Sequence, residues 1–312
     1  MISVILLIIG FVLLVKGADF FVEGASDIAR KLGIPSVVVG LTIVALGTSL
    51  PELSVSVTAA LKGSNDIALG NVTGSNIMNL LVVVGVAAVI RPVHVQKSVM
   101  KRDYSMSLVM ELLLFLCSAE LLFGKTGTLT RLDGLLLLAV MLGYMFFLLR
   151  HAVRNRIAEN FGISRPLPLS ILFCIIGAAA IIGGGQLVVN SATDLAYRLG
   201  MSETLVGLTI VAIGTSLPEL VTSVVAARKG ESDIALGNVL GSSILNIGFI
   251  LGLSGIIHPI AVDMLNLYDM LILIVVSVLF FVPLWKQERV SRLTGTGMLL
   301  VYLIYTIYII IR

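Results

Sequence analysis

The chain has 312 residues, of which 58% are hydrophobic and 12% charged, with a mean hydropathy of +1.08 and a net charge of +3. A soluble globular domain is about 45–50% apolar and about 25% charged, so this composition excludes an ordinary soluble fold. Because hydrocarbon offers no water to backbone amides, such a chain is expected to cross a membrane as helices. The sequence has no interleaved basic and aromatic residues of the kind that would indicate nucleic-acid binding. It also has no nucleophile–base pair or nucleotide-binding loop that would indicate an enzyme.

The first apolar run, Ile2 to Val15, has no basic segment before it and no small-residue cleavage site after it. This favours a retained span over a cleaved signal peptide. Further apolar runs, bounded by charges and prolines, predict ten transmembrane helices in all. They lie at about 2–24, 36–61, 67–90, 104–123 and 132–150, and then at about 168–190, 203–227, 234–257, 267–284 and 294–311. The fold class expected is therefore an all-α polytopic membrane protein.

The two halves of the chain repeat one another. Residues 40–79 and 207–246 align at a constant offset of 167, with 30 of 40 positions identical. We therefore expect two five-helix units, 1–150 and 168–312, joined by the polar segment 151–167. Because each unit crosses the membrane an odd number of times, the second must enter it in the opposite orientation. The pattern predicts an inverted repeat.

The positive charges of the predicted loops indicate the orientation. With the N-terminus outside, fifteen Lys and Arg residues fall in inner loops and five in outer loops. Inner loops of membrane proteins carry such an excess. We therefore expect a multi-pass protein of the cell (inner) membrane, with both termini on the outer side and the 151–167 linker in the cytoplasm.

Each copy of the repeat carries one acid inside an apolar span, Glu52 or Glu219, at the end of the motif Gly-Thr-Ser-Leu-Pro-Glu. A charge at the bilayer centre costs at least about 2.5–3.5 kcal/mol, so two of them imply a compensating cation. The proline before each acid removes a backbone donor, and it is expected to unwind spans two and seven and to free carbonyls at 45–48 and 212–215. Carboxylate, hydroxyl and carbonyl oxygens suit hard cations such as Ca²⁺ and Na⁺ and argue against zinc, copper or nickel.

The following span of each copy adds a second polar group to the predicted site. Ser75 and Asn79 are four residues apart and share one helical face, as do Ser242 and Asn246. Small-residue pairs, Gly70 with Gly74 and Gly237 with Gly241, allow helices to approach closely. An interhelical hydrogen bond without ion contact is the alternative interpretation of these Ser and Asn residues, and packing alone is the alternative for the glycines.

The remaining polar residues in apolar surroundings are given structural interpretations. Asp66 and Asp233 are expected in the first turns of spans three and eight, and Asp27 and Asp194 at the membrane interface. Glu111, in span four, has no repeated counterpart and receives no role. Two cysteines are expected to be buried thiols and three histidines to lie at span ends: Cys117, Cys174, His94, His151 and His258.

The paired GTSLPEL and GNxxGSxIxN segments resemble the α-repeats of the sodium/calcium exchangers, within the calcium/cation antiporter superfamily. The resemblance covers the whole chain and is closest to the prokaryotic members, since no large regulatory insert separates the halves. It implies four cation sites between spans two, three, seven and eight. It also implies alternating access, with spans one and six as the sliding gate.

Carried over residue by residue, the resemblance implies a calcium site formed by Glu52 and Glu219 with the backbone oxygens of Thr48 and Thr215. The sodium sites and the centre would use Ala45, Ala212, Ser49, Ser216, Ser75, Ser242, Asn79 and Asn246. Some relatives have an aspartate at one of the two final positions. Here both are Asn, so the pocket carries two formal negative charges.

The sequence therefore predicts an antiporter that exchanges Na⁺ for Ca²⁺, with both ions as substrates, no resident cofactor and no obligate protein partner. A Ca²⁺/H⁺ or other divalent cation/H⁺ antiporter is the main alternative, and a K⁺-dependent exchanger is a variant of the first interpretation. From another class, the repeats would suit a cation channel or a membrane scaffold without transport. The abundance of hydroxyl and carbonyl oxygens, and the lack of histidine near the motif, favour sodium over protons.

Overall fold

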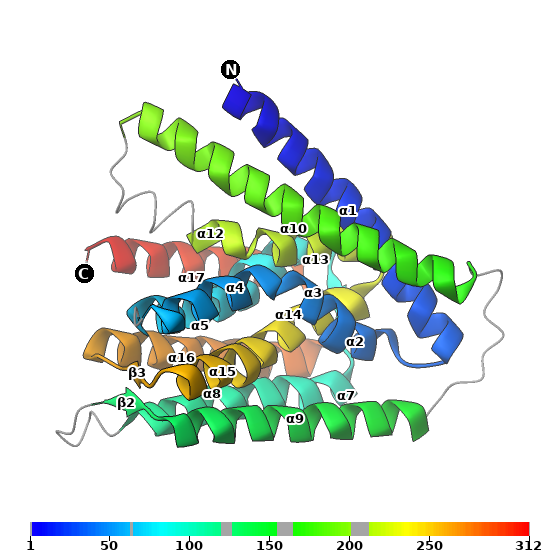
Figure 1. Cartoon of the computed structure of the whole chain (residues 1–312). Helices are drawn as coiled ribbons and strands as arrows, with labels where there is room; N and C mark the ends of the chain where they lie inside the picture. Colours follow the sequence, from blue (N-terminus) through cyan, green and yellow to red (C-terminus); the bar gives the residue numbers. More distant parts are fainter. Residues whose placement is uncertain (1, 63–64, 120–126, 155–164, 201–211, 312) are drawn as a thin grey trace.

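The structure is a computed structural model that describes residues 2–62, 65–119, 127–154, 165–200 and 212–311 (Figure 1). These residues are almost entirely helical. The first half contains α1 (Ile2–Leu32), α2 (Ser36–Val39), η1 (Gly40–Val44), α3 (Ala45–Thr48), α4 (Leu50–Leu61), α5 (Asn65–Met78), η2 (Asn79–Val83), α6 (Val84–Ile90), α7 (Lys97–Val99), η3 (Met100–Tyr104), α8 (Ser105–Ser118) and α9 (Arg131–Arg154). The second contains α10 (Leu167–Arg198), α12 (Ala212–Thr215), α13 (Leu217–Lys229), α14 (Ser232–Leu245), η6 (Asn246–Leu251), α15 (Gly252–Ile257), α16 (Met264–Gln287) and α17 (Arg292–Ile311).

Seven helices of the described chain are long and apolar enough to cross a membrane, and an eighth span results if the bent pair 36–48 and 50–61 is counted as one. This agrees with the predicted class of polytopic helical membrane protein. Two of the ten predicted spans, 104–123 and 203–227, extend into 120–126 and 201–211, which lie outside the described residues.

The first and sixth spans are longer than the sequence predicts. The predicted ends were near 24 and 190, but α1 has 31 residues and α10 has 32. Both helices continue through polar turns that carry Glu23, Asp27, Asp194 and Arg198. A helix of this length rises about 1.5 Å per residue and exceeds a hydrocarbon core of about 30 Å, so its charged turns reach beyond that core.

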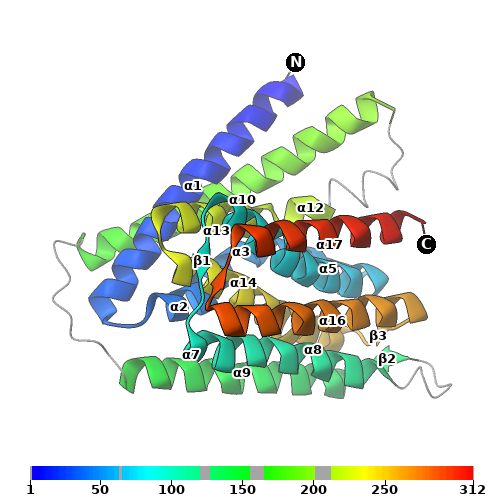
Figure 2. The same cartoon turned by 180° about the vertical axis from the view of Figure 1, so that it is seen from behind.

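Helices α1 and α10 cross each other along a seam of glycines and lie at an angle to the remaining helices, packing against α13, α2 and α12 at one side of the bundle (Figures 1 and 2). A Cβ added at Gly24 would lie 2.6 Å from the Ser170 carbonyl, and one added at Gly177 would lie 2.6 Å from the Phe21 amide. At the far end of the seam, a Cβ on Gly10 would lie 2.9 Å from the carbonyl of Gly184. The pairing runs antiparallel, and only glycine allows this approach of two backbones.

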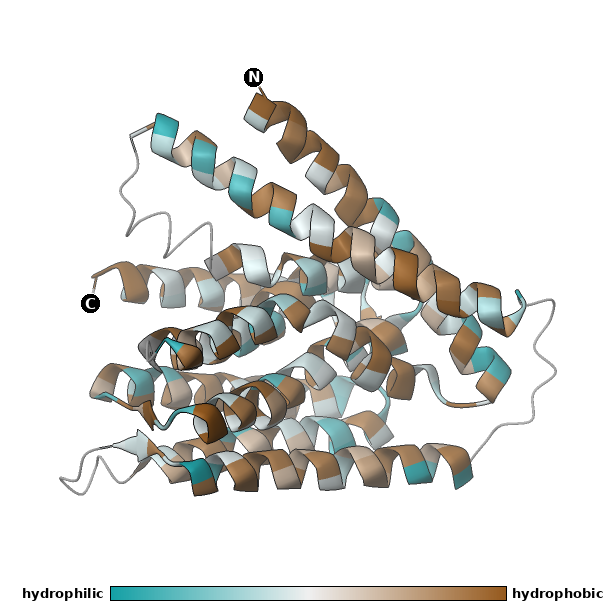
Figure 3. Ribbon diagram, in the orientation of Figure 1, coloured by the Kyte–Doolittle hydropathy of each residue, from teal (hydrophilic) through white to brown (hydrophobic). Residues whose placement is uncertain are grey.

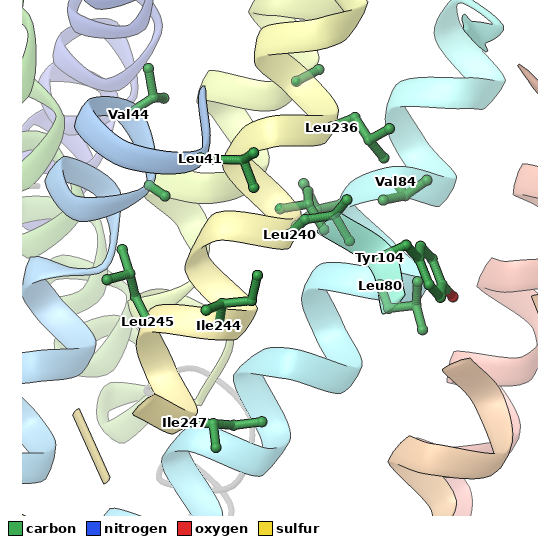
Figure 4. Close-up of a cluster of buried hydrophobic side chains, with 14 of the residues drawn as sticks. Leu41, Val44, Leu80, Val84, Tyr104, Leu236, Leu240, Ile244, Leu245 and Ile247 are labelled. Carbon is green, nitrogen blue, oxygen red and sulfur yellow. The ribbon is translucent and has the colours of Figure 1, made fainter. Parts of the chain in front are cut away.

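Helix α14 lies at the centre of the bundle, because it packs against η1, α2, α3 and α13 and is almost wholly buried. Its Leu240 is surrounded by apolar side chains that include Leu41 of η1 and Val84 of α6 (Figure 4). The outer helices α1, α9 and α17 instead have large apolar side chains exposed over much of their length. Figure 3 colours most of the N-terminal part of α1 as hydrophobic. Large exposed apolar surfaces of this kind mark contact with lipid.

Two short antiparallel strand pairs hold the connections at opposite ends of the bundle. β1 (Val93–His94) pairs with β4 (Arg289–Val290), and β2 (Thr128–Leu129) pairs with β3 (Ile260–Ala261). β4 precedes the outer helix α17 and pairs with the connection between α6 and α7 in the first half. β2 precedes the outer helix α9 and pairs with the connection between α15 and α16 in the second half. The two halves are therefore linked at their ends as well as through the core.

Candidate cation site

The first helix break occurs at a single residue, Ser49, between α3 and α4. Ser49 has φ −82° and ψ 6°, and the axes of residues 36–48 and 50–61 differ by 51°. The expected unwinding of 45–48 is wrong in extent, since these residues form a helical turn and the Ser49 amide donates to the Ala45 carbonyl over 3.0 Å. The reason is the position of Pro51 in the first turn of α4, where a missing N–H costs nothing. The Thr48 hydroxyl also lies 3.3 Å from the Ala45 carbonyl oxygen.

The second break has the same form. Ser216 has φ −90° and ψ 5°, and it separates the short α12 from α13, whose first turn contains Pro218. The Leu220 amide donates to the Ser216 carbonyl, as the Leu53 amide does to that of Ser49. Ala212 and Thr215, both predicted ligands, are the first and last residues of α12.

The two acids, Glu52 and Glu219, are fully buried, and each is bound by the serine of the opposite break. The Ser216 hydroxyl donates to Glu52 Oε1 over 3.2 Å, and the Ser49 hydroxyl donates to Glu219 Oε1 over 3.0 Å. The carboxylate of one half is therefore held by the other half. Both acids also occupy the first turn of a helix, whose positive dipole end favours negative charge.

Two further predicted serines approach the same oxygens. Ser75 of α5 lies 3.5 Å from Glu52 Oε1, and Ser242 of α14 lies 3.4 Å from Glu219 Oε1. The Ser216 and Ser75 hydroxyl oxygens also lie 3.2 Å from each other. The structure thus brings four predicted serines to the two carboxylates, one pair from the breaks and one from the following helices.

Asn79 and Asn246 are buried and begin the π-helical segments η2 and η6. Such wide turns interrupt α-helices mostly at functional positions. The Asn246 amide donates to Asn76 Oδ1 over 3.0 Å, and the Asn76 amide donates to the Ser243 carbonyl. Asn76 and Ser243 stand at one aligned position of the repeat where the copies differ.

Several buried oxygens of the site have no hydrogen-bond partner in the described chain. They are Glu52 Oε2, Glu219 Oε2, Asn79 Oδ1 and Asn246 Oδ1, and the Asn79 amide nitrogen is also unpaired. An unsatisfied buried polar group costs about 1–3 kcal/mol, and more when it is charged. These atoms belong to the helices that carry the repeat, and unpaired carboxylate and amide oxygens are of the type that hard cations prefer as ligands.

Two asparagines that the sequence interpretation missed donate hydrogen bonds to the backbone carbonyls of the two acids. Asn238 donates to the Glu219 carbonyl and to Ser223, and it accepts from the Thr48 hydroxyl over 2.9 Å. Asn71 donates to the Glu52 carbonyl and to Ser56. The signal was present, because a Gly-Asn dipeptide occurs at this aligned position in both copies.

The remaining acids of the spans lie away from these contacts. Asp233 accepts from Gln96 over 2.8 Å in the first turn of α14, as expected, whereas the Asp66 side chain lies outside what the structure describes. Asp27 lies 3.5 Å from Arg165, and Asp194 pairs with Arg198. Glu111 is buried and accepts from Ser107 over 3.3 Å.

The site differs from a resident metal centre in its ligands. In the part of the chain that the structure describes, no three His, Cys, Asp or Glu residues are grouped as a metal site.

The chain was compared with known proteins. A family model described as "Sodium/calcium exchanger protein" matches residues 2–150 and 169–311. The inner membrane protein YrbG of Escherichia coli is 38% identical over 309 residues, which cover 95% of this chain and 92% of YrbG. The sodium/calcium exchanger MaX1 of Methanosarcina acetivorans is 33% identical over 342 residues, which cover 98% of both chains.

Among solved structures, the fold is similar to that of the sodium–calcium exchanger NCX_Mj soaked with 10 mM Na⁺ and no Ca²⁺. The TM-score is 0.86, the identity is 31%, and the match covers 97% of both chains. The family match, the near-complete coverage and the shared helical architecture agree with one another. The chain therefore belongs to the sodium/calcium exchanger family, as one of its prokaryotic members.

Proposed function

We propose that this protein exchanges Na⁺ for Ca²⁺ across the membrane at the site between Glu52 and Glu219. The observation that carries the proposal is the cross-bonding of these acids. Each buried carboxylate has one oxygen bonded to the serine of the other half and a second oxygen without a partner among the described residues. MaX1 and NCX_Mj, which are named as sodium/calcium exchangers, are similar over nearly the whole chain.

The ligands assigned to the two ions follow the predicted set. Ca²⁺ is bound by Glu52 and Glu219 with the backbone oxygens of Thr48 and Thr215. Na⁺ uses the same carboxylates with the remaining oxygens. These come from the carbonyls of Ala45 and Ala212, the hydroxyls of Ser49, Ser216, Ser75 and Ser242, and the amides of Asn79 and Asn246. The C-terminal ends of α3 and α12 add negative dipole ends, which favour a cation.

The exchange mechanism follows from shared ligands. Both ions need the same two carboxylates, so sodium loading displaces calcium without a distant coupling element. With either ion bound, the negative charges of Glu52 and Glu219 are compensated, and the site is able to close to both sides of the membrane. Without an ion, two buried negative charges oppose passage through the closed state, because uncompensated charge in low dielectric is costly. This difference couples the two fluxes.

The proposal includes ten spans arranged as two inverted five-helix repeats, 1–150 and 168–312, with the 151–167 linker between them. Hydrogen bonds support this arrangement, because many of them recur between residues shifted by 167 positions along the chain. The Ser49–Glu219 contact corresponds to Ser216–Glu52, and Asn71–Ser56 corresponds to Asn238–Ser223. The antiparallel crossing of α1 with α10 also supports it, since these are the equivalent first helices of the two halves. With the charge bias of the loops, both termini face outward and the linker is cytoplasmic in the cell membrane.

Helices α1 and α10 are proposed as the gate. Their glycine seam joins them into one unit, and ion pairs attach α1 to the end of α13. Lys229 lies 2.9 Å from Glu23 and 3.2 Å from Asp19, while Arg30 lies 2.9 Å from Glu231. These pairs border a cavity of about 290 Å³ at this end of the molecule. Sliding of α1 along the bundle breaks them, so they stabilise one of the two access states.

Uptake of ⁴⁵Ca²⁺ into proteoliposomes tests the function. With sodium inside and none outside, the purified protein should accumulate calcium, and dissipation of the sodium gradient with an ionophore should stop accumulation. A downhill calcium leak that does not depend on sodium would identify a channel and contradict the proposal. A parallel series without potassium shows whether calcium uptake requires K⁺, as it would in a K⁺-dependent exchanger.

A Ca²⁺/H⁺ antiporter on the same fold is the second candidate. One observation favours it: the unpaired second oxygens of Glu52 and Glu219 suit protons as well as cations. The same vesicles distinguish the two, since a pH gradient alone would then drive calcium uptake and a sodium gradient alone would not. The described part of the site contains no histidine, which favours sodium.

A further inference from the structure

A second cavity, of about 260 Å³, lies at the surface between the start of α8 and the end of α16, away from the proposed ion site. It is lined by Lys101, Ser105, Phe281, Val282, Trp285 and Lys286. The two segments meet at one end of the bundle, where β1 pairs with β4 and Lys97 bridges to Glu288 over 2.9 Å (Figure 2). The cavity is thus held in place by contacts on both of its flanks.

Its two lysines differ from the basic residues beside them. Lys97 pairs with Glu288, and Arg102 makes two hydrogen bonds with the buried Asp103. Lys101 and Lys286 are exposed, and neither makes an ion pair with a residue of the described chain. Two unpaired ammonium groups that line one cavity create a site for an anion.

The rest of the cavity is apolar and aromatic. The Trp285 ring stacks on Phe281 with ring centroids 5.6 Å apart. Tyr104 is buried and does not line the cavity, but its ring packs against Phe281 with centroids 5.4 Å apart. Trp and Tyr gather where a membrane meets water, because their rings have an apolar body and a polar edge. Trp285 lies near the end of the candidate span 264–287, the position at which such a ring suits the headgroup level.

An apolar surface continues from the cavity along the same helices. On α16, Val278, Leu279 and Val282 are each about half exposed, and on α8 Val109 and Leu112 are too. A ligand that fills both the lysine-lined cavity and the apolar surface beside it must combine an anionic group with hydrocarbon chains. Basic pockets between transmembrane helices bind anionic lipid headgroups in this way.

We propose that this cavity binds an anionic phospholipid, with its phosphate between Lys101 and Lys286 and its acyl chains along α8 and α16. The apolar surface distinguishes a lipid from a free phosphate, which would gain nothing from it. The site is separate from the cation pathway and depends only on the membrane location. Bound lipid would link α8 to α16, outside the α1–α10 pair.

The single tryptophan of the chain, Trp285, makes the test direct, since all indole fluorescence comes from this cavity. The purified protein is placed in nanodiscs that contain a minor fraction of brominated phosphatidylglycerol or, separately, brominated phosphatidylcholine. Bromine quenches indole only at close range. The proposal predicts stronger quenching by the anionic lipid at equal mole fraction. Inorganic phosphate added to the buffer should leave this preference unchanged.

Charge variants supply the second arm. Each lysine near a membrane surface contributes about fivefold to anionic-lipid affinity. Lys101→Gln and Lys286→Gln should each reduce the preference about fivefold, and the double variant should abolish it. Lys31→Gln, at the exposed end of α1, should leave it intact. Size-exclusion chromatography of every variant reports folding and oligomeric state.

Three results would overturn the proposal. Equal quenching by both lipids would show that the cavity does not select charge, and a preference retained in the double variant would place the lipid elsewhere. Loss of the preference on addition of inorganic phosphate would identify a free-anion site. A dimer in which Trp285 is shielded from both lipids would assign the cavity to a second copy of the chain, and it too would contradict lipid binding.

Discussion

The Ser216 hydroxyl donates a hydrogen bond to the Glu52 carboxylate over 3.2 Å, across 164 positions of the sequence. The Ser49 hydroxyl makes the equivalent contact with Glu219 over 3.0 Å. Each serine lies at one helix break, and the acid that it binds lies in the helix that follows the other break. The two breaks therefore form one site, and neither half contains a complete copy of it.

The acids themselves are the first test of this site. Glu52→Gln or Glu219→Gln should weaken Ca²⁺ binding at least about 100-fold, because loss of one partner of a buried charge pair costs about 3–5 kcal/mol. Equilibrium ⁴⁵Ca²⁺ binding to purified protein measures this. Glu111→Gln is the matched control, since Glu111 is a buried acid bonded to Ser107 outside the site. Equal losses in all three variants would indicate a general effect of removing buried charge.

The serines of the breaks should act as a pair. Ser49→Ala and Ser216→Ala each remove a hydrogen bond to a charged group, which contributes about 1.5–3 kcal/mol, so each should weaken cation binding about tenfold or more. Isothermal titration with Na⁺, the ion to which these hydroxyls are assigned, gives the affinities. Ser54→Ala, on the exposed side of α4, should leave affinity unchanged. A large effect of one serine and none of the other would contradict a site shared equally by the halves.

The supporting asparagines should affect stability. Asn238→Ala removes the hydrogen bonds that Asn238 makes with the buried Thr48 hydroxyl and with the Glu219 carbonyl, and each contributes about 0.5–1.5 kcal/mol. We expect a lower thermal unfolding temperature in detergent, with a similar change for Asn71→Ala. Asn190→Ala, at an exposed position of α10, is the control. An unchanged unfolding temperature for both site variants would remove their proposed role.

The glycine seam should not tolerate side chains. Gly177→Ala places a Cβ 2.6 Å from the Phe21 amide, whereas Gly183→Ala, on the same helix, places one with nothing within 4 Å. Overpacking of this kind costs about 1–3 kcal/mol. Gly177→Ala should therefore lower the unfolding temperature and the rate of calcium uptake, and Gly183→Ala should change neither. If the two variants behave alike, close approach of α1 and α10 is not needed.

The sequence contained enough information to predict the helical membrane class and to single out Glu52 and Glu219, which the structure buries completely; their role as cation ligands stays a prediction. Glu52 and Glu219 stood out because a charge inside an apolar span is costly, and because the same 40-residue segment occurs twice. The partner of each serine was beyond prediction. Whether Ser49 meets Glu52 of its own half or Glu219 of the other depends on how segments 170 residues apart pack.

Local backbone geometry was also hard to predict. Proline indicated a break, but the break proved one residue long because Pro51 and Pro218 occupy first-turn positions where no donor is required. The π-helical turns at Asn79 and Asn246 have no residue signature and arise from tertiary packing. Asn71 and Asn238 were within reach, since both copies retain them beside a glycine.

Competition between the two ions tests the central claim most directly. Purified protein is equilibrated with ⁴⁵Ca²⁺ and titrated with Na⁺ at constant ionic strength, with choline as the replacement cation. If both ions need Glu52 and Glu219, sodium displaces all bound calcium, and the apparent calcium dissociation constant rises without limit as sodium increases. Calcium that stays bound at saturating sodium would contradict a shared site.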